Sequence, residues 1–291
     1  MVREEMISRF RQVLAKVPRG PLGDKLFLFI IFAYAHKRIP RRNSNLLNDY
    51  LYFLKSSSEL LDIMRQYTSD KILVKSFVAE RCGEQVVLPT LCAFYNIAKI
   101  DVSALSRPCV LKPAHGSGTV VFVDTRKQAL AEEDRKKLQT SLESCPYTTA
   151  REANYKHLRR RIVCEPMLPN GQATKDYKVF CYQGEPKAIQ VDSDRHSDHK
   201  RNLYTAEWEP IGISYNFPIG EWEPAPEKLS EILHISSMLS KEFEFVRVDF
   251  FIDDDKLYVA ELTHCPESAH GRFESQEAER RFSSLIFSQA G

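Results

Sequence analysis

Two acidic side chains near the end of the chain are the residues best suited to carry chemistry. They lie in segment 245–263, which reads as two β-strands joined by a polar turn at residues 253–255. If the loop holds three or five residues, Asp249 lies opposite Glu261 and both side chains leave the same face. Facing carboxylates destabilise a hairpin by about 0.2–1 kcal/mol unless a cation lies between them. Because Mg²⁺ prefers one or two carboxylates completed by water and phosphate, the pair predicts a nucleotide–metal site.

Acidic residues on a strand often form only a solvated face. The surroundings of this pair favour a functional site instead. Arg247 lies on the face of Asp249, two residues before it. A loop with His, Ser and Gly residues around Pro266 directly follows Glu261. A mixed-charge cluster at the end of an apolar hairpin favours a site.

A second set of residues is suited to holding phosphate. A strand ends at Lys112, and a turn containing Gly116, Ser117 and Gly118 leads to another strand. Glycines let backbone N–H groups curl around an anion, and the hydroxyl and lysine add donors. The pattern alone is weak, since most such glycines only turn a hairpin. It is neither a Walker loop nor a Rossmann fingerprint, because no GKS, GKT or GxGxxG sequence is present.

Four more residues are candidates for a nucleotide pocket. Glu165 closes an apolar strand just before Pro166, and a linker at this point could contact adenine. Asp176 and Lys178 alternate on one strand face, offering an acceptor for a ribose hydroxyl and a cation for phosphate. Lys71 lies at a helix start, where the dipole favours anions. Ordinary surface lysines and a turn-capping aspartate are the alternatives.

The composition argues against several classes of protein. The 291 residues are 43% hydrophobic and 27% charged with a net charge of +2, which is typical of a soluble globular protein and gives no global field for nucleic acid. The basic run at 156–161 reads as a solvated segment. Seven cysteines without CxxC spacing, and no signal-peptide pattern, lead us to expect reduced thiols, no zinc site and a cytoplasmic protein.

The longest apolar run, residues 26–35, is about half of what a bilayer span needs, so we expect no transmembrane segment. A basic stretch at 36–42 follows it. The apolar run and the basic stretch together predict a buried helix that is followed by a polar segment. Peripheral contact with anionic lipid is the alternative.

The order of elements predicts an α+β fold: helices first, then antiparallel sheet with interspersed helices. Gly83 is expected to end a helix that Ser69 and Asp70 cap. Predicted helices lie within 1–66, at 69–81, 127–142 and 226–241, and predicted strands at 86–91, 93–95, 109–113, 120–123, 161–168, 177–182, 187–191 and in the acidic hairpin.

These pieces occur in an order that resembles the ATP-grasp superfamily, and most closely its TupA-like branch, associated with bacterial teichuronopeptide and polysaccharide biosynthesis. The resemblance covers about residues 45–273. The segments that carry it are 70–78 (DKILVKSFV), 110–118 (VLKPAHGSG), 163–168 (VCEPML), 176–180 (DYKVF), 184–195 (GEPKAIQVDSDR), 200–204 (KRNLY), 245–250 (FVRVDF) and 260–263 (AELT).

The resemblance implies two α+β lobes whose antiparallel sheets grip ATP, preceded by N-terminal helices. We expect a helical region at 1–68, a first, smaller lobe with the glycine loop at 69–168, and a second lobe with the metal site at 169–291. The residues that would bind ATP are Lys71, Lys112, His115, Gly116, Ser117, Gly118 and Lys178 toward the phosphates, Glu165 toward adenine and Asp176 toward ribose.

The resemblance also implies the metal and the reaction. Asp249 and Glu261 would hold Mg²⁺, and Thr263 stands where the wider superfamily often has Asn, which puts a second metal in doubt because a hydroxyl is a poorer ligand. A carboxylate would attack the γ-phosphate, ADP would leave, and an amine would attack the acylphosphate. Arg247 and Lys178 would offset the developing charge. Arg195 and Arg201, in a polar stretch, would cover the phosphates or seat an acidic substrate.

The implied substrates are a small-molecule or saccharide carboxylate, such as a uronic acid in a polysaccharide precursor or a peptide-like metabolite, and an amine acceptor. His264 and His270 are expected to line the acceptor side, either as a base or as structural residues. Two other functions stay open: a kinase that phosphorylates a hydroxyl on the same scaffold, and a nucleotide-binding module without turnover.

Overall fold

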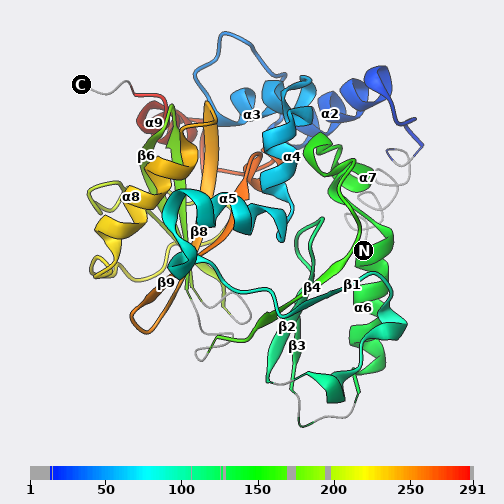
Figure 1. Cartoon of the computed structure of the whole chain (residues 1–291). Coiled ribbons are helices and arrows are strands. Elements are labelled where there is room, and N and C mark those ends of the chain that lie inside the picture. The colour runs from blue at the N-terminus through cyan, green and yellow to red at the C-terminus, as the bar shows by residue number, and fades with distance from the viewer. Residues whose placement is uncertain are drawn as a thin grey trace.

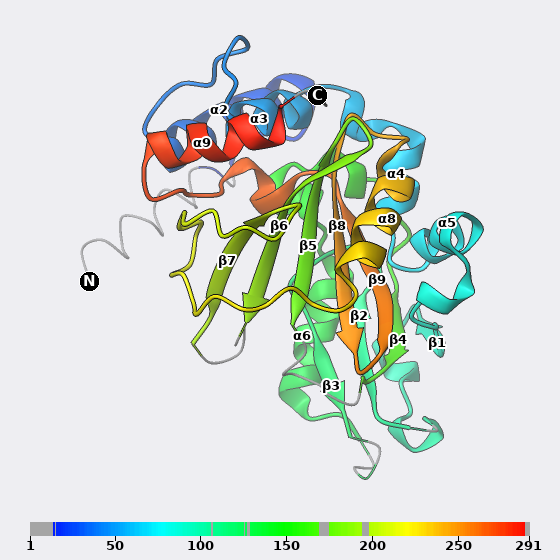
Figure 2. The ribbon, with the colours of Figure 1, turned by 90° about the vertical axis from the view of Figure 1, so that its left-hand side faces the viewer.

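Two antiparallel sheets form the framework of the protein (Figures 1 and 2). The structure is a computed structural model, and it describes residue 14 and residues 16–105, 107–124, 126, 129–168, 175–193 and 198–288. The smaller sheet has the order β1 (Cys92–Phe94), β4 (Ile162–Pro166), β2 (Cys109–Pro113), β3 (Val121–Val123), and the larger has the order β7 (Lys200–Thr205), β6 (Glu185–Ser193), β5 (Asp176–Tyr182), β8 (Phe245–Asp253), β9 (Lys256–Thr263). The α+β prediction is confirmed.

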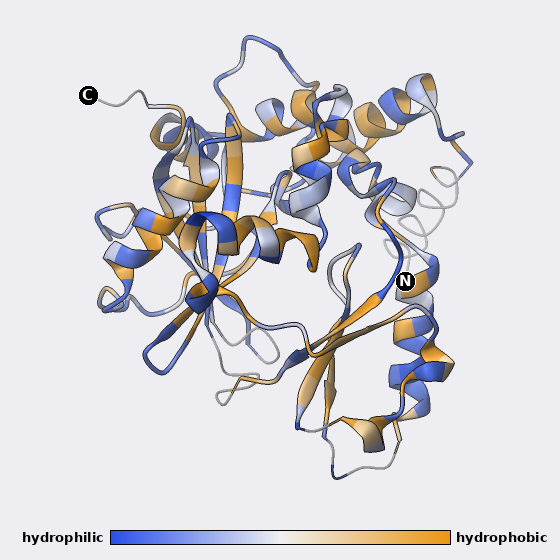
Figure 3. Cartoon of the chain, in the orientation of Figure 1, coloured by the Kyte–Doolittle hydropathy of each residue, from blue (hydrophilic) through white to orange (hydrophobic). Residues whose placement is uncertain are grey.

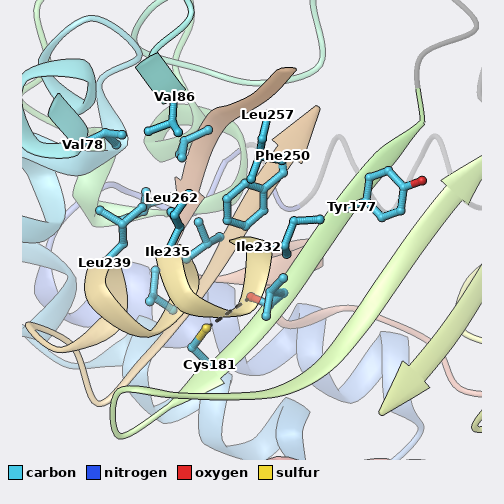
Figure 4. Packing of buried hydrophobic residues seen from close by; sticks show 14 of the residues in the cluster. Val78, Val86, Tyr177, Cys181, Ile232, Ile235, Leu239, Phe250, Leu257 and Leu262 are labelled. Carbon is cyan, nitrogen blue, oxygen red and sulfur yellow. Dashed lines mark hydrogen bonds between the residues drawn. The ribbon is translucent and has the colours of Figure 1, made fainter. Parts of the chain in front are cut away.

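One face of the larger sheet is apolar because its strands alternate. Val246, Val248 and Phe250 are completely buried in the largest hydrophobic cluster, which includes residues of helices α5 (Leu73–Cys82) and α8 (Leu229–Ser240) (Figure 4). Burying one such side chain contributes about 1.5–3 kcal/mol. The residues between them, which include Arg247 and Asp249, must therefore leave the opposite face.

That opposite face is only partly covered by helices. Phe180 and Phe245 pack at one end of it with residues of α3 (Leu47–Ser56) and α9 (Gln276–Ile286). Figure 2 shows α2 (Pro21–His36), α3 and α9 grouped at the same end of the sheet. The remainder of the face carries buried polar residues: Lys178, Gln190, Asp192, Arg201, Arg247 and Asp249.

The smaller sheet follows the same rule. Cys109, Leu111 and Cys164 pack toward Leu138 of α6 (Glu132–Glu143) in a separate cluster. The alternate residues, which include Lys112 and Glu165, leave the other face. Each sheet thus buries one face under helices and keeps polar residues for the other.

The helix predictions are confirmed where the structure describes them. Helices α2, α3 and α4 (Ile63–Ser69) lie within 1–66 or extend just past it, and α6 and α8 begin several residues later than predicted. Asp70 accepts hydrogen bonds from the N–H groups of Ile72 and Leu73, and Gly83 ends α5 at φ 89°, as predicted. Residues 1–13, 15, 127 and 128 lie outside the described part.

Three predictions were wrong or incomplete. Residues 86–91 form no regular strand, because the turn η2 (Glu84–Val86) and Pro89 leave only the isolated bridge of Val87 with Val259. In the polar stretch 192–202, residues 192–193 end β6 and residues 200–202 begin β7, and residues 194–197 lie outside the described part. Elements not predicted are α7 (Pro146–Ala150), α9, η1 (Glu59–Leu61), η3 (Ile97–Lys99), η4 (Val102–Ala104), η5 (Ala153–Tyr155) and η7 (Pro266–Ala269).

The predicted domain boundaries after residues 68 and 168 stay a prediction. Helix α5, assigned there to the first lobe, contributes Val74, Phe77 and Val78 to the core of the larger sheet. Among the described helices none combines the length and the apolar character needed to cross a membrane.

Replacing Leu239 of α8 with Ala should lower the free energy of unfolding by about 2–5 kcal/mol, because its side chain is fully buried and leaves a cavity. Leu22→Ala is the matched control: Leu22 is 85% exposed, so its change should stay within about 0.5 kcal/mol. Urea denaturation followed by circular dichroism measures both. Similar losses for the two variants would contradict this account of the core.

Candidate active site

The acidic hairpin brings its two carboxylates face to face, by a route that differs from the predicted one. The turn holds two residues, Asp254 and Asp255, and Asp253 pairs with Lys256. Such a register alone would place Asp249 opposite Ala260. A β-bulge next to Asp249 adds one residue to β9, and Asp249 pairs with Glu261 as predicted. Bulges often re-aim side chains near active sites.

Each carboxylate of the pair is held by a cation. Arg247 donates from Nε and Nη2 to the two oxygens of Asp249, both at 2.7 Å. Lys71, just before α5, donates to Glu261 Oε2 at 2.5 Å. Thr263 Oγ1 lies 3.2 Å from Glu261 Oε1 and 3.3 Å from Arg247 Nη2. The predicted metal residues and two predicted phosphate cations therefore form one connected group.

The two carboxyl groups differ in their ease of ionisation. Burial raises the pKa of Asp249 to about 6 and the nearby Glu261 adds to this, although Arg247 opposes it. Burial also opposes ionisation of Glu261, but Lys71 and Arg247 outweigh it and hold its pKa well below the usual range. A divalent cation beside the pair would favour the charged form of Asp249.

The donor set fits Mg²⁺ bound together with a nucleotide. Two carboxylates and a hydroxyl converge, and carboxylate oxygens keep free lone pairs beside their cations. Within the described ranges there is no group of three or more His, Cys, Asp or Glu residues that could hold a metal by itself. Mg²⁺ commonly takes one or two carboxylates and completes its shell with water and phosphate oxygens.

On the smaller sheet, Glu165 holds two lysines. Its oxygens lie 2.5 Å from Lys112 Nζ and 2.7 Å from Lys75 Nζ. Burial opposes ionisation of Glu165, but both lysines outweigh it and lower its pKa. Lys75 was not predicted, although it follows Lys71 by four residues and lies in the first turn of α5. Lys71 N–H donates to Ala114 O at 2.9 Å, which ties this end of α5 to the glycine loop.

In the glycine loop, the side chain of His115 is buried, whereas Gly116 and Ser117 line a hollow. The His115 ring is completely buried: Nε2 lies 3.1 Å from the carbonyls of Ser141 and Ser144, and Nδ1 accepts from the N–H of Arg161. Its side chain therefore anchors the loop and has no exposed surface for a ligand. Gly118 has φ 86°, with no atom within 4 Å of an added Cβ. Gly116 and Ser117 line a hollow of about 610 Å³ beside α6 and α7.

A chain of alternating charges crosses the larger sheet beside Asp249. Lys178, opposite Asp249 in the β5–β8 register, lies 2.5 Å from Asp192 and 3.4 Å from Asp176. Arg201 Nε donates to Asp192 at 2.6 Å. Burial opposes ionisation of Asp192, but Lys178 and Arg201 hold its pKa far below the usual range. Asp192 was not predicted as a site residue, and Arg195 lies outside the described residues.

A known protein family matches most of the chain. The sequence profile described as "TupA-like ATPgrasp" matches residues 50–286. The chain belongs to the TupA-like ATP-grasp family. Its α+β fold with two antiparallel sheets is an ATP-grasp fold, as predicted. No curated protein matches the chain significantly.

Several solved structures are similar to this ATP-grasp chain at low sequence identity. D-alanine–D-alanine ligase from Bacillus anthracis complexed with ATP is 18% identical, over 76% of this chain and 62% of that one, with a TM-score of 0.42. The D-cycloserine synthetase DcsG is 14% identical, over 82% and 77%, with a TM-score of 0.43. The ATP-grasp ligase PsnB with its minimal precursor is 11% identical, over 75% and 55%, with a TM-score of 0.37. The chain thus spans less than two thirds of two of these proteins.

Beyond β9, the ATP-grasp chain makes a left-handed turn that the sequence did not predict. Glu267, Ser268 and Ala269 have φ 49°, 57° and 63°, and such non-glycine residues cost about 1–2 kcal/mol each. Arg201 Nη1 donates to Glu267 at 2.9 Å. The buried Lys55 of α3 donates to the carbonyl and hydroxyl oxygens of Ser268, at 2.9 and 2.5 Å. Two cations therefore hold the turn in place.

Two histidines lie near this turn: His264 is buried, and His270 is half-buried. His264 is 1% exposed, and its ring nitrogens lie 3.1 Å from Arg65 Nη1 and 2.8 Å from Thr68 Oγ1. Burial, together with Arg65, lowers its pKa well below the usual value. Burial lowers the pKa of His270 to about 3. These contacts favour the structural alternative for His264.

Without divalent cations, Asp249 should make the protein lose stability as the pH rises from about 4 to about 6, since a carboxyl with a raised pKa binds more protons when folded. The loss should reach about 2–3 kcal/mol. The Asp249→Asn variant should lack this component, and Mg²⁺ with ATP should reverse it in the wild type. Urea denaturation at several pH values measures it.

Asp254→Asn in the exposed turn of the same hairpin is the matched control and should keep the wild-type pH profile, since its backbone conformation at φ 50° suits Asn. Identical pH profiles for the wild type and Asp249→Asn would contradict the raised pKa.

Proposed function

We propose that the protein is an ATP-dependent carboxylate–amine ligase that forms an amide through an acylphosphate and releases ADP and phosphate. The observation that supports the proposal is the Lys71–Glu261 contact, in which a lysine lies beside the facing carboxylates. Lys112 lies near enough to Glu261 to lower its pKa. Lysines from β2 and from the segment before α5 thus lie near a carboxylate pair on β8 and β9, which supports a single triphosphate site.

In the first step, an oxygen of the substrate carboxylate attacks the γ-phosphorus in line, and the bond to the β-phosphate oxygen breaks. When bound, Mg²⁺ would supply positive charge that offsets the charge developing on the phosphate. Asp249 and Glu261 would hold it, with Thr263 beside them. Arg247 and Lys178 donate toward the transferring group, and Lys71 and Lys112 toward the other phosphates. Catalysis by positioned charge suits a set of buried cations that need little reorganisation.

In the second step, the amine nitrogen attacks the acyl carbon, phosphate leaves, and the nitrogen loses a proton. The turn at 267–269 follows the metal strand directly, so we assign it to the acceptor side. Arg201 and Lys55 position it through Glu267 and Ser268.

For the nucleotide itself, we assign Asp176 to the ribose and the end of β4 to adenine. Glu165 has both oxygens on lysines, so we assign its side chain to holding Lys75 and Lys112 toward the phosphates. Gly116, Ser117 and Gly118 would close over the phosphates through their backbone, with His115 anchoring the loop.

The proposed carboxylate is a uronic acid of a polysaccharide precursor or a peptide-like metabolite, and the chemistry of the site suits both. Purified protein should be incubated with ATP, Mg²⁺, candidate uronic acids and amino acids, and its products separated. Release of ADP and phosphate, with hydroxylamine trapping the acylphosphate as a hydroxamate, supports the ligase. AMP with pyrophosphate contradicts it. A stable phosphorylated product formed without an amine indicates a kinase, and ATP binding without turnover a binding module.

The double variant Asp249→Ala, Glu261→Ala should lose at least about a hundredfold in kcat, because the charge that stabilises the transition state is no longer held. The variant Asp254→Ala, Asp255→Ala removes two carboxylates from the turn of the same hairpin and should keep wild-type activity. Steady-state ADP release measures both. Full activity in the first double variant would overturn the assignment of the site.

Lys55→Met should raise KM for the amine about ten- to hundredfold, because the turn that positions the acceptor loses its buried cation. The Kd for ATP should stay unchanged, measured by calorimetry. Lys99→Met, at an exposed lysine, is the control and should match the wild type. An unchanged KM together with a weaker Kd for ATP would assign Lys55 to the nucleotide instead.

A further inference from the structure

Helix α2 exposes apolar side chains that its position in the fold does not explain. Leu22, Leu26 and Phe29 are 85%, 52% and 42% exposed. Their spacing of four and three residues places them on one stripe of the helix, here called the apolar row. The opposite stripe packs on α3 through Phe27, Leu28 and Phe32. Figure 3 shows hydrophobic residues along α2, which lies at the edge of the molecule.

A basic groove lies at the C-terminal end of α2. It is a hollow of about 1130 Å³ between the end of α2, the following loop and the start of α9. Its charged residues are Lys37, Arg38, Arg41, Arg272 and Arg280, with Glu279 as the carboxylate among them. This concentration of positive charge contrasts with a net charge of +2 for the whole chain.

Part of this charge is not neutralised by the protein. Arg38 is paired with Asp49 and Glu279, and Arg280 with Glu277. Lys37, Arg41 and Arg272 form no ion pair with any residue of the described ranges. The exposed Lys25 lies on the edge of the apolar row, and Lys37 directly follows the last residue of α2. Unpaired cations beside exposed apolar side chains need a partner that is both anionic and apolar.

We propose that this face docks on an anionic membrane surface, with the apolar row in the headgroup–acyl boundary and lipid phosphates in the basic groove. A helix of 16 residues is about 24 Å long, shorter than the hydrocarbon core, so α2 lies in the interface and does not span it. The charge argues against a second copy of the chain, because a two-fold contact would place the basic groove near its own copy.

Docking in this way places the site beside the membrane. His36, at the end of α2, makes a 2.9 Å hydrogen bond to the carbonyl oxygen of Ala269 in the left-handed turn. The helical layer that would lie on lipid therefore contacts the segment that follows the metal strand. Membrane binding does not require catalysis. The docking proposal can therefore fail while the proposed reaction holds, and the proposed reaction can fail while the docking holds.

Co-sedimentation of the full-length protein with phosphatidylcholine vesicles, with and without phosphatidylglycerol, tests the proposal. We expect binding to the anionic vesicles only, and its loss at about 1 M salt, where the Debye length is about 3 Å. The variant Arg41→Ala, Arg272→Ala should bind about fivefold more weakly for each cation removed. The variant Leu22→Ser, Leu26→Ser, Phe29→Ser should lose binding. All five side chains are exposed, and thermal unfolding checks that the variants stay folded.

Trp222→Ser and Lys256→Ala are the controls: both side chains are exposed, but neither belongs to the row or the groove, so binding should match the wild type. Wild-type binding by the triple serine variant would overturn the proposal. So would retention of a soluble polyanion such as heparin without vesicle binding, or a dimer in analytical ultracentrifugation that the triple variant abolishes.

Discussion

The partly buried contact between Lys71 and Glu261 is the interaction on which the site depends. Glu261 faces the buried Asp249 across the hairpin, and two carboxylates side by side are unfavourable unless cations accompany them. Arg247 pairs with Asp249 from the same strand, but Lys71 reaches Glu261 from the segment between α4 and α5. Since the backbone of Lys71 also bonds to Ala114, the same residue ties the glycine loop to β9.

The other buried charges follow the same arrangement. Glu165 holds Lys75 and Lys112, and Asp192 holds Lys178 and Arg201. In each case one carboxylate keeps two cations in fixed positions on the polar face of a sheet. Buried ion pairs are weak evidence for stability, because desolvation offsets much of their attraction. Here the ion pairs hold the cations in position. Cations that are held before a ligand binds need little reorganisation when charge develops.

The N-terminal helices are part of this architecture. Helix α3 contributes Leu47 and Leu51 to the second core and Lys55 to the turn after β9. Helix α2 reaches the same turn through His36. A strained turn persists only where its surroundings hold it, and these two helices supply that support together with Arg201. The helical layer therefore links the proposed acceptor side to the outer surface of the molecule.

Most strands and long helices and most candidate residues could be predicted from the sequence, since alternation of apolar and polar residues sets strand faces and glycine or capping residues mark helix ends. The pairing of Asp249 with Glu261 was predicted from a loop of three or five residues, but a two-residue turn and a bulge that the sequence did not reveal produce it. Tertiary structure decided that His115 turns inward and that Lys75, Asp192 and Lys55 join the charged groups. Those outcomes depend on contacts between residues far apart in the chain, and local pattern carries no information about which partners meet.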